Sequence, residues 1–285
     1  MMRLILKSLR DSVSLMRKNK LLFILLFVLQ IIFLVFIVYI TYGFESKMYE
    51  NQKAIDEYVG NLNLSEESIM SGVMQQKGFL GDDPNSISRN FIELEGNFRS
   101  YLFSLFVLLV FFTALSWGIT SLFFEEEGRK NFLSFAKNFS RILAVAAFYL
   151  SMIFLLFYVL FDTAALKPAL ELKGIFTGIA AFLTLSYVLS YFMYISIPLL
   201  RTNGFENLVQ KTLSIGIRKF RYVIITSLIN LSVIITSAWL FAYFIIIESD
   251  LLVISVSFLL IVLGFVFGRI FKSSLIGKID KDSVK

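Results

Sequence analysis

The stretch LLFILLFVLQIIFLVFIVYITYG, residues 21–43, contains no charged side chain and is long enough to decide the fold. An α-helix needs about 20 consecutive apolar residues to cross the hydrocarbon core of a bilayer. Further runs of this kind, also without Asp, Glu, Lys, Arg or His, are residues 101–123, 142–161, 175–200, 222–247 and 251–268. The sequence therefore predicts an all-α fold, a single polytopic membrane domain over residues 1–285 with six transmembrane helices.

The composition agrees with this fold and excludes several kinds of chemistry. Apolar residues make up 57% of the 285 residues and charged residues 17%, whereas soluble domains are about one quarter charged. The chain has no cysteine and no histidine, which excludes disulfides, thiolate nucleophiles and imidazole acid–base catalysis. We expect no catalytic site, no cofactor and no metal site. The first apolar run is too long for a signal-peptide core, so we expect it to remain as a helix.

Lysine and arginine are distributed unevenly between the two sides of these helices. Residues 1–20, the second-to-third and fourth-to-fifth connections and the C-terminal segment carry 20 Lys/Arg and 7 Asp/Glu; the other connections carry 7 and 14. Because Lys and Arg accumulate in cytoplasmic loops, the pattern predicts a multi-pass protein of the cytoplasmic membrane with both termini inside. The basic side also predicts contact with anionic lipid headgroups. No basic stripe lies elsewhere, so we expect no nucleic-acid partner.

Three amphipathic stretches precede odd-numbered membrane helices: residues 3–18, 129–140 and 205–220. Each alternates apolar and basic positions at helical spacing, which is typical of a helix lying in the membrane interface. We interpret them as parts of three repeats, each an interfacial helix followed by a membrane hairpin. The alternative is that any cytoplasmic connection of a membrane protein is basic and amphipathic.

Two segments lie outside this pattern. Residues 44–100 are predicted to form an extracytoplasmic helical loop or cap, because they have too few large apolar side chains for a core of their own. Residues 272–285 are predicted to be a basic cytoplasmic tail. Asn63 begins a glycosylation sequon on the outer side, and the sequence alone does not decide its use.

Three consecutive carboxylates, Glu125, Glu126 and Glu127, follow the second membrane helix. Neighbouring helical positions point in different directions, so these side chains cannot converge on a metal ion without a loop. The first interpretation is a solvated helix end that Gly128 terminates. The alternative is a docking surface for a cytoplasmic partner.

A polar stripe runs along the fourth membrane helix, with hydroxyl side chains at spacings of three and four residues. Hydroxyls in hydrocarbon need partners, and Asn230 in the fifth helix is a candidate partner. The stripe is either hydrogen-bonding contact between helices or a polar groove for an amphipathic ligand. The candidate groove residues are Thr184, Tyr187, Tyr191, Tyr194 and Asn230.

Two small-residue motifs, Gly174–Gly178 and Gly264–Gly268, have the spacing that lets membrane helices approach closely. They predict packing within the chain, with homo-oligomerisation as the alternative.

The N-terminal segment Leu6-Lys-Ser-Leu-Arg-Asp-Ser-Val-Ser-Leu-Met-Arg-Lys-Asn-Lys-Leu-Leu22 and its two echoes resemble a prokaryotic, largely archaeal, group of six-helix membrane proteins. This group is related to the membrane domain attached to some glycerophosphodiester phosphodiesterases. The resemblance covers nearly the whole chain and implies a multi-pass bundle of repeated hairpins with no assigned activity. No phosphodiesterase residues are present to carry over.

The segment Glu125-Glu-Glu-Gly128 is loosely similar to the Glu-rich segment that follows the second helix in permease subunits of type-2 ABC exporters. These permeases also have an amphipathic helix before the first membrane helix. The present chain departs from their pattern after Gly128, where the Thr-Leu-Glu-like continuation is missing. Its fifth-to-sixth outer connection is also too short for re-entrant helices.

Membrane-embedded charge, which is typical of ion-coupled carriers and channels, is absent from all six apolar runs. We therefore expect a non-enzymatic membrane protein that acts through lipid or partner binding as an accessory or scaffold component. The alternative is the permease subunit of an exporter that needs a separate cytoplasmic ATPase.

Overall fold

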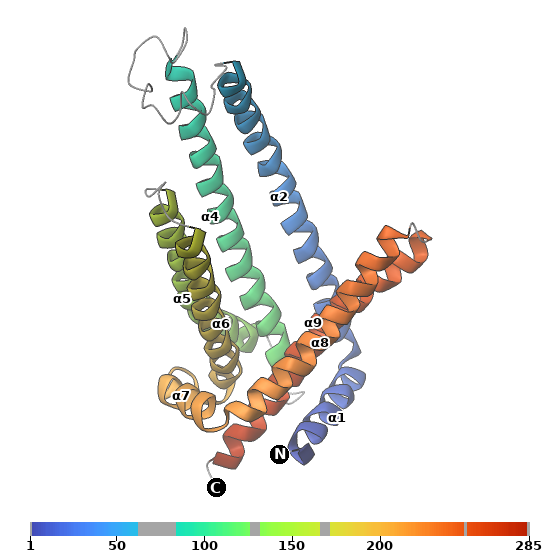
Figure 1. The fold of residues 1–285 in the computed structure, drawn as a ribbon. Helices are drawn as coiled ribbons and strands as arrows, with labels where there is room; N and C mark the ends of the chain where they lie inside the picture. Colours follow the sequence, from blue (N-terminus) through green and yellow to red (C-terminus); the bar gives the residue numbers. More distant parts are fainter. Residues whose placement is uncertain (1, 62–83, 126–131, 166–171, 248–249, 284–285) are drawn as a thin grey trace. The chain divides into compact units, whose positions relative to one another are not determined.

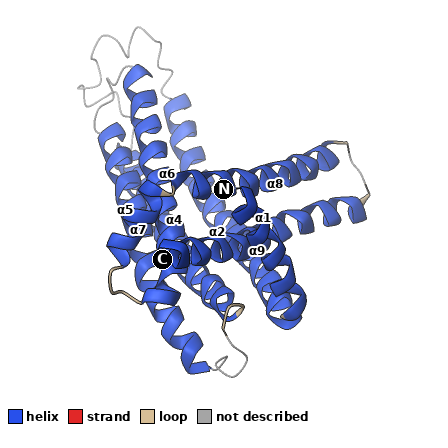
Figure 2. Ribbon diagram, turned by 90° about the horizontal axis from the view of Figure 1, so that it is seen from below, coloured by secondary structure: helices blue, strands red, loops and turns tan. Residues whose placement is uncertain are grey.

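The computed structural model describes residues 2–61, 84–125, 132–165, 172–247 and 250–283, and these contain helices but no strands (Figure 2). In hydrocarbon a helix satisfies all its backbone polar groups internally, which long apolar runs require. The helices are α1 (Met2–Lys18), α2 (Lys20–Asn61), α4 (Pro84–Leu122), α5 (Phe132–Ala165), α6 (Leu172–Asn203), α7 (Leu208–Arg218), α8 (Phe220–Ile246) and α9 (Leu251–Ser283) (Figure 1).

Six of these helices contain stretches long and apolar enough to cross a membrane. The stretches are Lys20–Asp56, Arg89–Leu122, Phe132–Leu160, Phe176–Arg201, Phe220–Ile246 and Leu251–Lys281. Each contains nearly all of one apolar run identified in the sequence. The predicted fold class, an all-helical bundle with six membrane-spanning helices, is confirmed.

The chain divides into two compact units. One is Leu34–Leu108, and the other combines Met1–Phe33 with Leu109–Lys285. In the first unit, the Tyr101 hydroxyl of α4 lies 3.3 Å from Oγ1 of Thr41 on α2, and its ring packs 5.7 Å from that of Phe44. The expected outer segment therefore contains long continuations of two membrane helices. The remainder of that segment, including Asn63, lies outside the described residues.

Helix α9 is the central packing element of the second unit. It runs beside α8, as Figures 1 and 2 both show, and also contacts α1 and α6. Its apolar side chains join a buried cluster with α2 and α4. The members of this cluster are Leu26, Ile119, Phe123, Val266 and Ile270.

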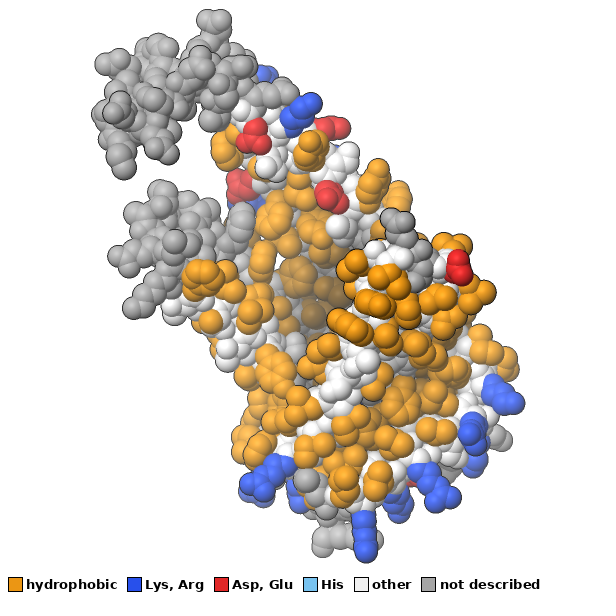
Figure 3. Space-filling view, turned by 45° about the vertical axis from the view of Figure 1, so that its right-hand side comes forward, with side chains coloured by type: hydrophobic (Ala, Val, Ile, Leu, Met, Phe, Trp, Pro, Cys, Tyr) orange, Lys and Arg blue, Asp and Glu red, His pale blue; other side chains and the backbone are white. Residues whose placement is uncertain are grey.

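Both ends of the described chain lie at the same end of this unit. Lys278 of α9 forms an ion pair of 2.6 Å with Asp11 of α1, and the Ser274 hydroxyl lies 3.4 Å from the Ser8 carbonyl oxygen. We call the part formed by α1, α7 and the last turns of α9 the basic end. Lysine and arginine side chains gather there, while apolar side chains cover the helices above it (Figure 3).

The C-terminal segment differs from the basic tail expected over residues 272–285. Helix α9 continues without interruption to Ser283, and Phe271, Leu275, Ile276 and Ile279 are almost fully buried. With Ile270 these residues form an apolar face at helical spacing, which buries against neighbouring helices. The lysines between them made the segment look like a tail in the sequence.

The second expected interfacial helix also differs. The part of residues 129–140 that the structure describes forms the first turns of α5, which continues to Ala165. By contrast, α1 ends at Lys18, and α7 ends at Lys219, whose φ of −113° and ψ of 18° leave the helical region. Two of the three predicted repeats thus begin with a separate short helix.

The glycine motif of the last helix packs within the chain. A Cβ built on Gly264 would touch Val233 and Ile234 of α8, and one built on Gly268 would overlap the side chain of Asn230. A Cβ on Gly178 of α6 would lie 2.9 Å from Leu160 of α5. Small residues therefore let both hairpins close, as expected for small-residue motifs in membrane helices.

Candidate functional site

An apolar groove with a volume of about 370 Å³ lies between α5, α6 and α7. Binding sites for small molecules typically have volumes of about 300–1,000 Å³. Several of its apolar side chains are strongly exposed: Phe148 is 61% exposed, Phe205 54%, Val209 73% and Leu213 44%. The other lining residues are Ala144, Val145, Tyr149, Phe192, Ser196, Leu208 and Thr212.

Three hydroxyl groups on the wall of the groove bond to one another. The Tyr149 hydroxyl of α5 lies 3.1 Å from Oγ of Ser196 on α6, and the Thr212 hydroxyl of α7 donates to the same Oγ at 3.3 Å. Ser196 in turn donates to the Phe192 carbonyl at 2.7 Å. Each polar group thus has a partner inside the protein, and the three helices are joined around the groove.

Two further contacts hold α7 in place beside α6. The Tyr191 hydroxyl donates to the Gly216 carbonyl at 2.8 Å, and a Cβ on Gly216 would stand 2.7 Å from the Phe192 ring. Glycine at 216 therefore allows close contact between the two helices.

Arg141 of α5 packs against the turn that follows α6, close to the groove. The α6 helix ends at Asn203 and is followed by Gly204, whose φ of +61° favours glycine. The guanidinium group of Arg141 packs over this glycine, with Nη2 3.4 Å from the position of a Cβ. Phe205, which lines the groove, follows this glycine directly, so Arg141 lies next to the groove without lining it.

Glu125 lies in an internal polar cluster at the same end of the protein. Its Oε1 accepts hydrogen bonds from the Ser134 hydroxyl at 2.8 Å and the Asn138 amide at 2.9 Å. Asn138 also lies 3.2 Å from Oγ of Ser121. The carboxylate therefore joins the end of α4 to the first turns of α5 and differs from the solvated helix end expected. Glu126 and Glu127 lie outside the described residues.

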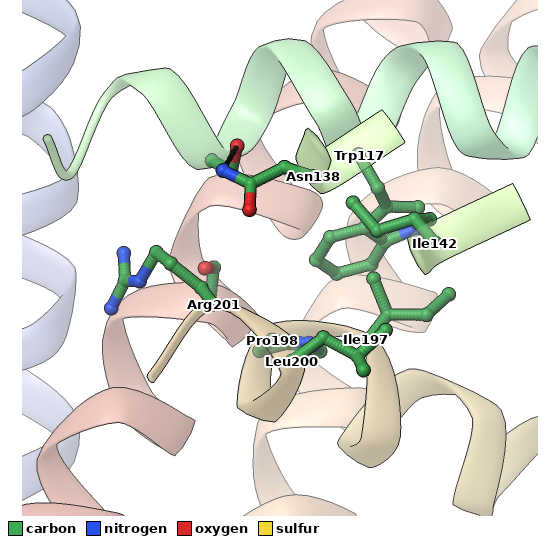
Figure 4. A pocket seen from close by; sticks show the side chains of 9 residues that line it. Trp117, Asn138, Ile142, Ile197, Pro198, Leu200 and Arg201 are labelled. Atoms are coloured by element: carbon green, nitrogen blue, oxygen red, sulfur yellow. Dashed lines mark hydrogen bonds between the residues drawn. The ribbon is translucent and has the colours of Figure 1, made fainter. Parts of the chain in front are cut away.

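Arg201, at the end of α6, completes this cluster. Its guanidinium lies 4.3 Å from the Phe124 ring centroid and is within electrostatic range of Glu125. It passes α9 at Gly277, where a Cβ would stand 3.0 Å from Nη2. Figure 4 shows Arg201 and Asn138 bordering a narrow cavity, with Trp117 and Ile142 on its other side.

Two further cationic side chains, both on α9, are also held inside the bundle. Arg269 donates to Oε1 of the buried Gln30 of α2 at 2.9 Å, and Lys272 lies 4.4 Å from the centroid of the Tyr194 ring. An amide oxygen and an aromatic face are favourable but uncharged partners for cations. The basic end therefore keeps positive charge inside the protein as well as on its surface.

The five residues of the predicted polar groove do not lie around a common cavity. Thr184 and Tyr187 are exposed, and the Thr184 hydroxyl donates to the Ala180 carbonyl of its own helix. Tyr191 bonds to α7 and Tyr194 contacts Lys272, whereas Asn230 packs against Gly268 in the other hairpin. None of the five lines the groove or the cavity described above. For Tyr191, hydrogen bonding between helices is the interpretation that the contacts favour.

The sequence analysis missed the residues that form the groove. Tyr149, Ser196 and Thr212 belong to three different segments, and no local spacing relates them. The available signal was in residues 205–220, where Phe205, Val209 and Leu213 repeat every four residues. This stripe was identified as a membrane-interface face, and only the structure places α5 and α6 beside it.

Among the described residues, no group of three or more His, Cys, Asp or Glu side chains is placed to hold a metal ion. The fold and its surface define the class: the chain is an integral membrane protein with six helices able to span a bilayer. Comparison with known proteins finds no matching family model, no matching curated protein and no matching solved structure.

Proposed function

We propose that this protein is a lipid-binding accessory or scaffold component of the cytoplasmic membrane with no catalytic site of its own. The observation that carries the proposal is the preformed apolar groove between α5, α6 and α7. Its walls include exposed apolar residues of α7, a helix that is not one of the six membrane-spanning stretches. Such a surface is stabilised when apolar chains cover it.

The polar groups of the groove support binding rather than catalysis. Among the described residues that line it, the polar side chains are those of Tyr149, Ser196 and Thr212, whose hydroxyl groups are joined through Ser196. A nucleophilic hydroxyl needs an adjacent general base, and none of these described lining residues serves as one at neutral pH. The same hydroxyls are well suited to hold three helices together.

The orientation of the protein is part of the proposal. We infer that the basic end faces the cytoplasm, with both termini inside, because Lys and Arg accumulate on the cytoplasmic side of membrane proteins. The ion pair between Asp11 and Lys278, which places α1 and the end of α9 together, supports a common side for the two termini. The resemblance to archaeal six-helix membrane proteins remains a prediction.

The direct test is purification of the full-length chain in mild detergent and native mass spectrometry of the protein as isolated. We expect lipid to remain bound through detergent exchange. Reconstituted liposomes are then assayed for lipid hydrolysis, lipid transfer and solute flux. Reproducible turnover by the purified chain would contradict the accessory role, as would a protein that retains no lipid.

The alternative proposal is a permease subunit that needs a separate cytoplasmic ATPase. The observation in its favour is α1, a separate amphipathic helix before the first membrane-spanning helix. Glu125 is directed into the protein, so a docking surface would have to use other residues of the segment. Recovery of a stoichiometric ATPase with the chain from native membranes would favour the permease; its absence favours the accessory role.

A further inference from the structure

We propose that the groove between α5, α6 and α7 binds a single anionic glycerophospholipid, with Arg141 holding the phosphate and the groove holding one acyl chain. This inference rests on the proposed lipid-binding function and names the class of lipid and the residue that selects it. It is carried by three observations: the volume of the groove, the position of Arg141 and the exposure of α7.

The volume and lining of the groove suit a flexible acyl chain. The groove has a volume of about 370 Å³, within the range of about 300–1,000 Å³ that is typical of small-molecule sites. Apart from the hydroxyl groups of Tyr149, Ser196 and Thr212, the described lining side chains are apolar, and hydrocarbon that covers them is removed from water.

The position of Arg141 relative to the lining residues gives the site its polarity. Arg141 precedes Val145 and Phe148 by four and seven residues on α5, so the three side chains lie on one face of the helix. Arg141 stands about 6 Å beyond Val145 along the helix axis. A phosphate at Arg141 would continue directly into an acyl chain beside Val145 and Phe148.

The charge around Arg141 complements an anionic headgroup. In the part of the chain that the structure describes, Arg141 has no ion-pair partner, although it is partly buried over Gly204. The exposed Lys137 lies one turn earlier on the same face of α5. Arginine forms two parallel hydrogen bonds to phosphate, and a second cation nearby favours a headgroup with net negative charge.

The exposure of α7 argues that this site is covered in the membrane. Phe205 and Val209 lie outside the six membrane-spanning stretches and are more than half exposed. Away from this stripe, Ile215 and Gly216 of α7 are buried against the protein. The apolar stripe along the groove is thus the part of α7 that a lipid chain would cover.

The test compares lipid binding to the purified full-length protein by native mass spectrometry. The probes are phosphatidylglycerol and phosphatidylcholine with the same oleoyl chains, and soluble glycerol phosphate as the headgroup alone. We expect one tightly bound phosphatidylglycerol, weaker phosphatidylcholine and no binding of glycerol phosphate. Competition by glycerol phosphate at concentrations similar to those of the lipid would show a simple anion site and overturn the proposal.

Two variants separate the headgroup from the chain. Arg141→Gln should weaken phosphatidylglycerol binding by about tenfold, the loss expected for one charged hydrogen-bonding partner, and leave phosphatidylcholine nearly unchanged. Ala144→Trp should abolish binding of both lipids. Ala144 is exposed and lines the groove, so a large side chain there fills the groove without disturbing the core.

Each variant has a matched control. Arg218→Gln removes the same charge from an exposed position of α7 that does not line the groove, and Leu155→Trp adds bulk at an exposed position of α5 outside it. Equal phosphatidylglycerol affinity in Arg141→Gln and Arg218→Gln, or unchanged binding in Ala144→Trp, would overturn the site. The same apparent melting temperature in all four variants shows that folding is preserved.

The outcomes also distinguish this inference from the proposed function. Lipid turnover or a recovered ATPase would contradict the accessory role and leave the groove measurements valid. Bound lipid that is insensitive to Ala144→Trp would contradict the groove site and leave a lipid-binding accessory protein.

Discussion

Asn230 of α8 lies directly against the backbone of Gly268 in α9, so that a methyl group at position 268 would overlap the Asn230 side chain. The two helices can approach this closely only because position 268 has no Cβ. Gly264, one turn earlier, leaves more room: a Cβ there would lie 3.4 Å from Ile234. In this glycine motif, position 268 therefore has no room for a Cβ, whereas position 264 can accept one with little movement of its neighbours.

Gly268→Ala should lower the free energy of unfolding by about 1–3 kcal/mol, because overpacking forces neighbouring groups to shift. Gly264→Ala should cost less than half of this. Urea titration or apparent melting temperature in detergent measures both. Gly96→Ala is the control, since a Cβ at this exposed position meets no other atom within 4 Å.

A double variant tests whether Asn230 is the cause. Asn230→Ala removes the group that a Cβ at 268 would meet, so Gly268→Ala should cost clearly less in that background. A strictly additive pair of effects would show that the overlap is relieved elsewhere, contrary to this explanation.

Glu125→Ala should destabilise the protein by about 2 kcal/mol, because Ser134 and Asn138 then lose their shared acceptor in a partly buried site. Glu125→Gln keeps an acceptor oxygen and should cost less. Thermal unfolding of the purified variants measures the effect. If Glu125→Ala left stability unchanged and removed a bound partner, the carboxylate would belong to a docking surface.

The ion pair between Lys211 of α7 and Asp280 of α9 gives a further test of the packing of the C-terminal segment. The distance is 3.1 Å, and the Asp280 side chain is 6% exposed. Lys211→Met should cost about 3 kcal/mol because it removes an ammonium group that compensates the charge of a buried carboxylate. Asp280→Asn in the same chain should recover part of the loss. Lys219→Met, at an exposed position, is the charge-matched control and should be nearly neutral.

The orientation can be measured by cysteine labelling, because the chain contains no cysteine of its own. Ser14→Cys in α1 and Glu50→Cys in α2 are both exposed in the structure. In intact cells, a membrane-impermeant maleimide should label Glu50→Cys and reach Ser14→Cys only after permeabilisation. The reverse pattern would place the basic end outside the cell and would contradict the proposed orientation.

The membrane-spanning helices were predictable from the sequence because each depends on its own composition. A run such as residues 21–43 becomes a helix in hydrocarbon whatever its neighbours are. The α1 helix was predictable for a similar reason, since its apolar and basic residues separate within sixteen positions. In α9, however, the lysines beyond Arg269 led to the prediction of a basic tail, whereas contacts with α1, α6 and α7 hold this segment as part of the packed helix.

The candidate site was less predictable than the fold. The spacing of the tyrosines predicts that they share one face of α6. It does not predict which other helices contact that face, because this depends on how the hairpins pack. Tyr187 is left exposed, and Tyr191 finds its acceptor in α7. The groove forms where Val145, Ser196 and Val209 come together. Val145 and Ser196 are separated by about fifty positions in the sequence, and Val209 lies beyond the turn between α6 and α7.

The position of α9 also has a consequence for biogenesis. A membrane protein is synthesised from its N-terminus, so Gln30 enters the bilayer long before its partner Arg269 exists. Until α9 has been synthesised, α1, α2 and α4 lack a surface on which they pack. The hairpins made earlier must therefore stay in the lipid without this contact. Assembly of this bundle is thus completed only after α9 has been synthesised, and a ribosome that stalls before residue 269 would leave α2 without this contact.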